Sequence, residues 1–225
     1  MLTEFLNERD KKWMLEYDAM ARSYDIIMCY LTPLFSVGLE PFERYTWVKQ
    51  LQIKKGANVL DISTGTGRNL SFIIRQIGSK GRLAAMDISQ GALGYAKIKI
   101  KRKRWKNIEL HRANASYLPY KDDVFDAVMH VGGINTFGDK KRAVHDMVRV
   151  AKRNSKIIVV DEGLALGKEK TFLGKFLLKS NALYAYRPPI GLLPNNIKDL
   201  QVSWKTMLAG PMIAWPHYIV ELRKA

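Results

Sequence analysis

Apolar and polar positions follow two different periods along this chain. In residues 6–25 and 38–51 the apolar side chains recur every three to four positions, which predicts helices. From residue 57 onward, short apolar runs alternate with segments that have helical spacing. Strands that are joined through helices of this length run parallel, so the pattern predicts a parallel sheet with helices on both faces.

The apolar runs define the expected strands. They lie at residues 57–63, 81–89, 108–115, 125–133 and 155–163, with helices expected at 68–78, 90–105 and 139–152. After Gly163 the pattern becomes irregular and is broken by three prolines, until two last strands are expected at 199–208 and 215–224. Their connection is too short for a parallel crossover, so they should pair antiparallel. The predicted fold is α/β: a Rossmann-like, doubly wound sheet of seven strands, mostly parallel, with the last strand antiparallel between the fifth and sixth, plus N-terminal helices.

Composition narrows the class of protein. A chain of 225 residues with 47% hydrophobic residues is expected to form one domain with a full core. The single Cys29 excludes an internal disulfide framework, and no metal site is expected. The longest apolar window, residues 26–39, contains Pro33 and is shorter than the roughly 20 residues of a membrane-spanning helix. We therefore expect a cytoplasmic protein that is at most peripheral to a membrane.

The charge is strongly positive. A net charge of +16 and a pI near 9.9 favour an anionic partner, although a lysine-rich soluble surface would give the same values. The densest basic run is Lys97–Lys106. It fits a solvated helix face, a contact with an anionic membrane surface, or a contact with RNA.

A glycine-containing turn follows the first predicted strand, in "VLDISTGTGRNL". Gly65 and Gly67 lie where open parallel sheets bind ligands, and glycine lets the backbone approach a ligand closely. A dinucleotide fingerprint would require glycine at Leu70, and a P-loop would require a Gly-Lys-Ser/Thr sequence that is absent. The remaining pattern is acidic-x-small-x-Gly-x-Gly, formed by Asp61, Ser63 and the two glycines.

Two further motifs follow in order. Asp87 and Ile88 come at the end of the second strand, in "MDIS". The third strand ends in "RANASYLPYKDDVFDAVMH", which contains Asn114, Ala115 and, at the end of the fourth strand, His130.

Together these motifs resemble the class I methyltransferases that use S-adenosylmethionine. Within that family the chain is most similar to the methyltransferases of ubiquinone and menaquinone biosynthesis, over about residues 17 to 163. The resemblance implies one domain in three parts: a helical cap (1–55), a cofactor-binding core (56–163) and a substrate-side segment with the final hairpin (164–225). The part after Gly163 does not match the group well.

The resemblance also implies roles for individual residues. The loop of Asp61, Ser63, Gly65 and Gly67 would pass under the methionine and ribose of S-adenosylmethionine, and Asp87, followed by Ile88, would accept the ribose hydroxyls. Asn114 and Ala115 would hold the adenine, Asn114 through its side chain. Tyr17 and Tyr24 resemble aromatic residues of a helix that closes over the cofactor.

The acceptor side is less defined. His130 is the first candidate for a catalytic base or an adenosine-facing contact, and Asp161 and Glu162 could face an acceptor. The expected function is methyl transfer to a small, hydrophobic or lipid/quinone-like molecule. Two alternatives are an RNA-directed methyltransferase that uses Lys97–Lys106, although no Asn/Asp-Pro-Pro-aromatic motif is present, and a non-catalytic basic binding protein.

Overall fold

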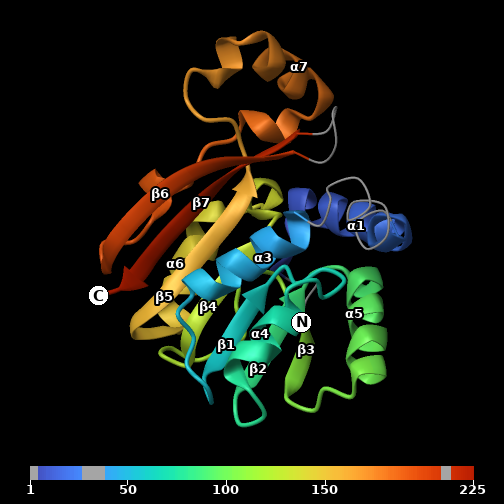
Figure 1. Ribbon diagram of the computed structural model, residues 1–225, viewed down its shortest axis with the longest axis vertical. Coiled ribbons are helices and arrows are strands. Elements are labelled where there is room, and N and C mark those ends of the chain that lie inside the picture. The colour runs from blue at the N-terminus through green and yellow to red at the C-terminus, as the bar shows by residue number, and fades with distance from the viewer. Residues whose placement is uncertain (1–4, 27–38, 209–213) are drawn as a thin grey trace.

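Seven strands form one sheet in the order β3-β2-β1-β4-β5-β7-β6 (Figure 1). The structure is a computed structural model that describes residues 5–26, 39–208 and 214–225. The strands are β1 (Asn58–Ile62), β2 (Arg82–Asp87), β3 (Ile108–Arg112), β4 (Phe125–Val131), β5 (Ala151–Glu162), β6 (Ile197–Leu208) and β7 (Ala214–Lys224). β1 to β5 run parallel, and β7 lies antiparallel between β5 and β6. The predicted fold class is therefore confirmed, including the position of the last strand.

Helices cover both faces of this sheet. The α-helices in the described ranges are α1 (Glu8–Ile26), α3 (Leu39–Gln50), α4 (Leu70–Ile77), α5 (Gln90–Lys103), α6 (Lys140–Val150) and α7 (Phe172–Ser180). Side chains of α3, α4 and α5 form one hydrophobic cluster with one face of the sheet, and those of α6 form a second cluster with the other face. Val59 and Leu60 of β1 point to opposite faces and both are completely buried, which explains the continuous apolar run of this strand.

The junction between α6 and β5 differs from the sequence prediction. A strand was expected from residue 155, whereas β5 begins at Ala151, directly after the last residue of α6. Ala151 is buried and pairs with Phe125, and the regular ladder resumes only where Ala127 pairs with Lys156. The polar residues between these pairs hid the early start of the strand, because they lie in an irregularity of the register and not in an apolar run.

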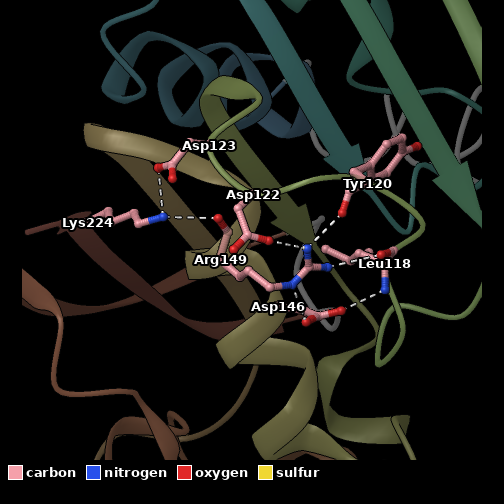
Figure 2. A network of polar contacts seen from close by, with 7 residues as sticks. All are labelled: Leu118, Tyr120, Asp122, Asp123, Asp146, Arg149 and Lys224. Atoms are coloured by element: carbon pink, nitrogen blue, oxygen red, sulfur yellow. Dashed lines mark hydrogen bonds and ion pairs between the residues drawn. The ribbon is translucent and has the colours of Figure 1, made fainter.

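A polar network fixes the loop between β3 and β4 (Figure 2). Arg149 of α6 donates hydrogen bonds to the carbonyl oxygens of Leu118 (3.1 Å) and Tyr120 (2.7 Å), and it also pairs with Asp122 and Asp146. Lys224 of β7 donates to Asp123 (2.8 Å) and to the carbonyl of Arg149 (3.0 Å). Arg149 thus fixes an irregular loop to α6. The same loop begins beside Asn114 and Ala115, which belong to the site described below.

Residues 164–187 form a separate projection beyond the carboxyl end of β5, at the top of Figure 1. They contain α7 and the short 3-10 helices η4 (Lys168–Lys170) and η5 (Ala182–Ala185). Leu164, Leu177 and Tyr184 form a small hydrophobic cluster of their own. No helix in the described ranges is long and apolar enough to cross a bilayer.

Candidate active site

A cavity of about 160 Å³ lies at the carboxyl ends of the parallel strands, beneath α1. This is the position at which open α/β sheets bind ligands. Its walls come from the loops after β1, β2, β3 and β4 and from one side of α1. The lining residues are Asp10, Trp13, Tyr17, Met20, Ala21, Ser63, Gly65, Thr66, Met86, Asp87, Ile88, Ala92, Ala113, Asn114, Ala115, Val131, Gly132, Gly133, Thr136, Phe137 and Glu162.

The two glycines after β1 have different environments. Both adopt positive φ, +56° at Gly65 and +79° at Gly67, and Ser63 does so as well (+55°). A Cβ at Gly65 would meet nothing within 4 Å, whereas a Cβ at Gly67 would lie 2.6 Å from Leu70 Cδ1 and 3.3 Å from Ala96 Cβ. Gly65 therefore leaves its space to the cavity that it lines, and Gly67 lets the loop pack against α4 and α5.

Asp61 lies underneath this loop and is fully buried. Its Oδ2 accepts a hydrogen bond from Thr64 Oγ1 (2.6 Å), and its Oδ1 accepts from Asn69 Nδ2 (3.2 Å). Burial raises the pKa of Asp61 to about 6, although these two hydrogen bonds act in the opposite direction. Asp61 is not part of the cavity wall in this conformation, and its binding role stays a prediction.

Asp87 joins the second strand to the glycine loop. Its Oδ2 accepts from the backbone N–H of Gly65 (2.8 Å) and its Oδ1 from that of Ser89 (2.9 Å). Burial raises the pKa of this carboxyl despite both hydrogen bonds. Asp87 and its neighbour Ile88 both line the cavity. A carboxylate has about four lone-pair positions, so Asp87 can accept further hydrogen bonds from a ligand while it holds the loop.

Asn114 connects the sheet to the N-terminal helix. Its Nδ2 donates to the carbonyl of Phe5 (2.8 Å) and to Asp10 Oδ2 (3.0 Å), while its Oδ1 accepts from the N–H of Ser116 (2.9 Å). Both amide hydrogens are thus used within the protein, and one lone pair of Oδ1 remains for a ligand. Ala115 lines the cavity beside it.

One side of α1 covers the cavity. Trp13 and Tyr17 both line it, with ring centroids 5.8 Å apart. The second predicted tyrosine, Tyr24, also belongs to α1, but its side chain lies outside the described part of the structure. Asp10 anchors the start of the helix, because its Oδ1 accepts from the N–H of Gly138 (2.8 Å).

His130 lies behind the cavity wall and not on it. Its side chain is fully buried, and Nε2 accepts a hydrogen bond from the N–H of Ile134 (3.0 Å). Burial lowers the pKa of His130 to about 3, with the carbonyl of Ile62 acting in the opposite direction. The ring would have to release Ile134 before it could accept a proton at Nε2. In this conformation it supports Phe137, a lining residue whose ring centroid is 5.2 Å away, and a catalytic role stays a prediction.

Asp161 and Glu162 form a carboxyl pair at the end of β5. Asp161 is buried, and its two oxygens accept from the N–H groups of Asn135 and Glu162, each at 2.8 Å. Burial, together with the charge of Glu162, raises the pKa of Asp161 well above its usual value. Glu162 reaches the cavity, and its Oε1 accepts from Trp215 Nε1 at 3.4 Å.

Some lining residues were not identified from the sequence. Gly132 and Gly133 follow β4 with φ of +76° and +115°, and the double glycine after a strand was a usable signal. Asp10, Trp13 and Phe137 had no such signal, because they reach the cavity only through the placement of α1 and of the turn after β4.

Comparisons with known proteins give a consistent result. Residues 7–171 match the model of the ubiE/COQ5 methyltransferase family. The ubiquinone/menaquinone biosynthesis C-methyltransferase UbiE of Francisella tularensis subsp. novicida is 28% identical in an alignment of 192 positions that covers 80% of this chain and 75% of that protein. A SAM-dependent methyltransferase from Aquifex aeolicus has the same fold, with a TM-score of 0.61 at 16% identity over 92% of this chain and 98% of that one. So does the Haemonchus contortus phosphoethanolamine N-methyltransferase 2 in complex with S-adenosyl-L-methionine, with a TM-score of 0.67 at 13% identity over 89% of this chain and 59% of that one.

Proposed function

We propose that this chain, which belongs to the ubiE/COQ5 methyltransferase family, methylates a ring carbon of a small, hydrophobic, quinone-like acceptor. The chain is an S-adenosylmethionine-dependent methyltransferase. The relatives that carry the name UbiE are C-methyltransferases of ubiquinone and menaquinone biosynthesis, and this supports an aromatic carbon acceptor.

The cavity has the chemical features that this cofactor needs. Asp87 offers acceptors for a ribose diol, Gly65 leaves its Cβ space open, and Oδ1 of Asn114 retains a lone pair that suits the amino group of adenine. Apolar side chains such as Ile88 and Ala115 can flank a purine ring, and Tyr17 lies on the α1 side. When bound, S-adenosylmethionine supplies an electrophilic methyl group on a sulfonium. We propose that these residues, together with Ser63 and Gly67 and with Asp61 beneath the loop, hold it.

One observation supports the acceptor class: an apolar and aromatic wall with the carboxylate of Glu162 beside it. Trp13, Met20 and Phe137 contribute to this wall. Among the described residues, the carboxylates that line the cavity are Asp10, Asp87 and Glu162. Asp10 and Asp87 each accept hydrogen bonds with both oxygens from the protein.

Glu162 is therefore the carboxylate that is best placed to act on an acceptor. A hydroquinone becomes a carbon nucleophile when its hydroxyl loses a proton, and Glu162 would take that proton. The ring carbon then gains the methyl group, and its own hydrogen leaves as a proton when aromaticity returns. The apolar walls would orient the ring and exclude water from it.

A labelling assay tests this function. Purified protein is incubated with methyl-labelled S-adenosylmethionine and a prenylated hydroquinone that has one open ring carbon, with the oxidised quinone, phosphoethanolamine and RNA as competing acceptors. We expect label in the hydroquinone alone. Glu162→Gln should lower kcat by about a hundredfold or more while the cofactor still raises Tm, whereas Glu109→Gln, at a side chain that is 71% exposed, should change neither. Label in RNA, or full activity of Glu162→Gln, would contradict the proposal.

No observation in the described residues favours the RNA-directed or the non-catalytic alternative. Lys99, from the middle of the basic run, donates to the carbonyl of Thr66 at 2.9 Å. Part of this run therefore supports the glycine loop.

A further inference from the structure

Helix α7 carries an apolar face that points to solvent. Phe172 is 91% exposed, Leu173 55% and Phe176 52%. At about 100° per residue these three side chains lie within an arc of about 100°. The buried Leu177 lies about 40° beyond Leu173 and the buried Gly174 about 100° beyond it, so the buried side adjoins the exposed face. The inner side already packs in the small cluster with Leu164 and Tyr184, so packing within the described fold does not account for the outer side.

Lysines border this apolar face. Lys175 and Lys179 lie on one flank of the helix, and Lys168 and Lys170 precede it in η4, all exposed. Leu166, 79% exposed, lies in the same projection. The acidic residue of the segment, Glu169, pairs with Arg187 (3.6 Å), so the outer surface carries an excess of positive charge.

We propose that this surface, made of Leu166, Phe172, Leu173, Phe176 and the four lysines, docks the protein onto an anionic lipid bilayer. A helix with a large-apolar outer face and flanking lysines lies in the plane of a membrane, with the apolar side chains in the acyl boundary and the ammonium groups at lipid phosphates. The charge of the segment selects an anionic surface, and each lysine strengthens the attraction.

The position of the projection supports a bilayer over other partners. It stands beyond the carboxyl end of β5 and away from the parallel strands (Figure 1), so it extends outward from the fold. By contrast, the basic run Lys97–Lys106 has one large apolar side chain that is strongly exposed, Ile98 at 64%. The run 97–106 therefore carries positive charge but has few apolar side chains that could insert into a bilayer.

The docking surface is also close in sequence to the proposed catalytic carboxylate. The segment begins two residues after Glu162, which lines the cavity. If the acceptor is lipid-like, as the proposed function states, the bilayer would supply it at the acceptor side of the cavity. Docking itself does not depend on the identity of the acceptor.

Vesicle flotation without any substrate tests the docking, and its failure is therefore distinguishable from failure of the proposed function. The probes are two kinds of vesicle: phosphatidylcholine alone, and phosphatidylcholine mixed with about 30% of the anionic lipid phosphatidylglycerol. We expect the full chain to float with the anionic vesicles, and Phe172→Ser/Phe176→Ser to weaken binding at least about tenfold. Lys168→Gln/Lys175→Gln/Lys179→Gln should weaken it by a similar factor and reduce its salt dependence.

The matched control is Ile98→Ser, an equally simple change at an exposed apolar side chain on α5, which should bind as the unmodified protein does. Equal Tm values of all variants would show that the exposed substitutions leave the fold intact. Three results would overturn the proposal: no binding to anionic vesicles, equal loss in Ile98→Ser, or undiminished binding of the double serine variant. A dimer or an RNA complex that the double serine variant abolishes, without vesicle binding by the unmodified protein, would assign the surface to that occupant instead.

Discussion

The buried ion cluster behind the glycine loop allows a quantitative test by the substitution Glu40→Gln. Glu40, in the first turn of α3, is 1% exposed and accepts hydrogen bonds from the buried Arg44 and the half-buried Arg68. Arg44 also donates to Asn69 Oδ1 (2.7 Å), and Asn69 donates to Asp61. The cluster thus links α3 to the loop that lines the cavity.

The expected cost follows from this geometry. Removal of one partner from a buried ion pair costs about 3–5 kcal/mol, because it leaves buried charge uncompensated. Glutamine preserves the shape of Glu40, and Arg44 keeps its bond to Asn69, so we expect the lower part of that range, about 3 kcal/mol. The exposed pair Lys12–Glu16 on α1 gives the control, since Glu16→Gln should cost less than about 0.5 kcal/mol.

The assay is urea denaturation at equilibrium, followed by circular dichroism. Burial raises the pKa of Glu40, but Arg44 and Arg68 together outweigh it, so the pKa lies below its usual value. The contribution of Glu40 is therefore complete above about pH 4.5 and disappears as the pH falls below that value. A loss below about 1 kcal/mol at pH 7, or a loss of equal size at pH 3, would refute this reasoning.

Four further substitutions give distinct expectations. Asp87→Asn should abolish most of the rise in Tm that S-adenosylmethionine produces, measured by thermal shift; an undiminished rise would remove Asp87 from the site. Gly67→Ala should destabilise the fold by about 2 kcal/mol or more, because its Cβ would lie 2.6 Å from Leu70. Gly65→Ala should cost about 1 kcal/mol and should mainly lower the affinity for the cofactor. Equal urea midpoints for the two variants would contradict this difference. His130, with its pKa lowered to about 3, takes up a proton on unfolding below pH 6.5, so stability should fall by about 2 kcal/mol from pH 7 to pH 5 on its account. His130→Gln should remove this part of the pH dependence, as urea titrations at both pH values would show, and an unchanged pH–kcat profile of this variant would exclude a role as base.

The fold was predictable to a large extent because its signal is local. Buried parallel strands must be apolar along their whole length, and α4 and α5 show helical spacing between them, so both kinds of element were visible in the sequence. The start of β5 was not, because residues 152–155 lie in a register irregularity and are polar. Helix α7 was also missed, since its apolar residues face both the small cluster and the solvent and show no one-sided pattern.

The candidate site was predictable where a residue is fixed by the strand that precedes it. Ser63, Gly65 and Ala115 follow strand ends, Asp87 is the last residue of β2, and all four line the cavity. Asp61 and His130 also belong to strands, but their side chains point into the protein and not into the cavity, which the sequence could not show. Trp13 depends on the docking of α1, a contact between segments about a hundred residues apart that is made by Asp10 and Asn114.

The place of β7 between β5 and β6 has a consequence for how the chain is made. On a ribosome, β1 to β5 can pair as they emerge, since the neighbours within this group all lie upstream of residue 163. β6 emerges next but has no sheet partner among the described strands until residues 214–224 have followed it, because it pairs with β7 and not with β5. Until then β5 exposes an unpaired edge that contains the apolar run Ile157–Val160, which is the kind of surface that makes partly folded chains prone to aggregate. The last strand therefore inserts between β5 and β6, next to the end of the sheet, and a stalled or shortened translation product would leave the edges of both strands unpaired.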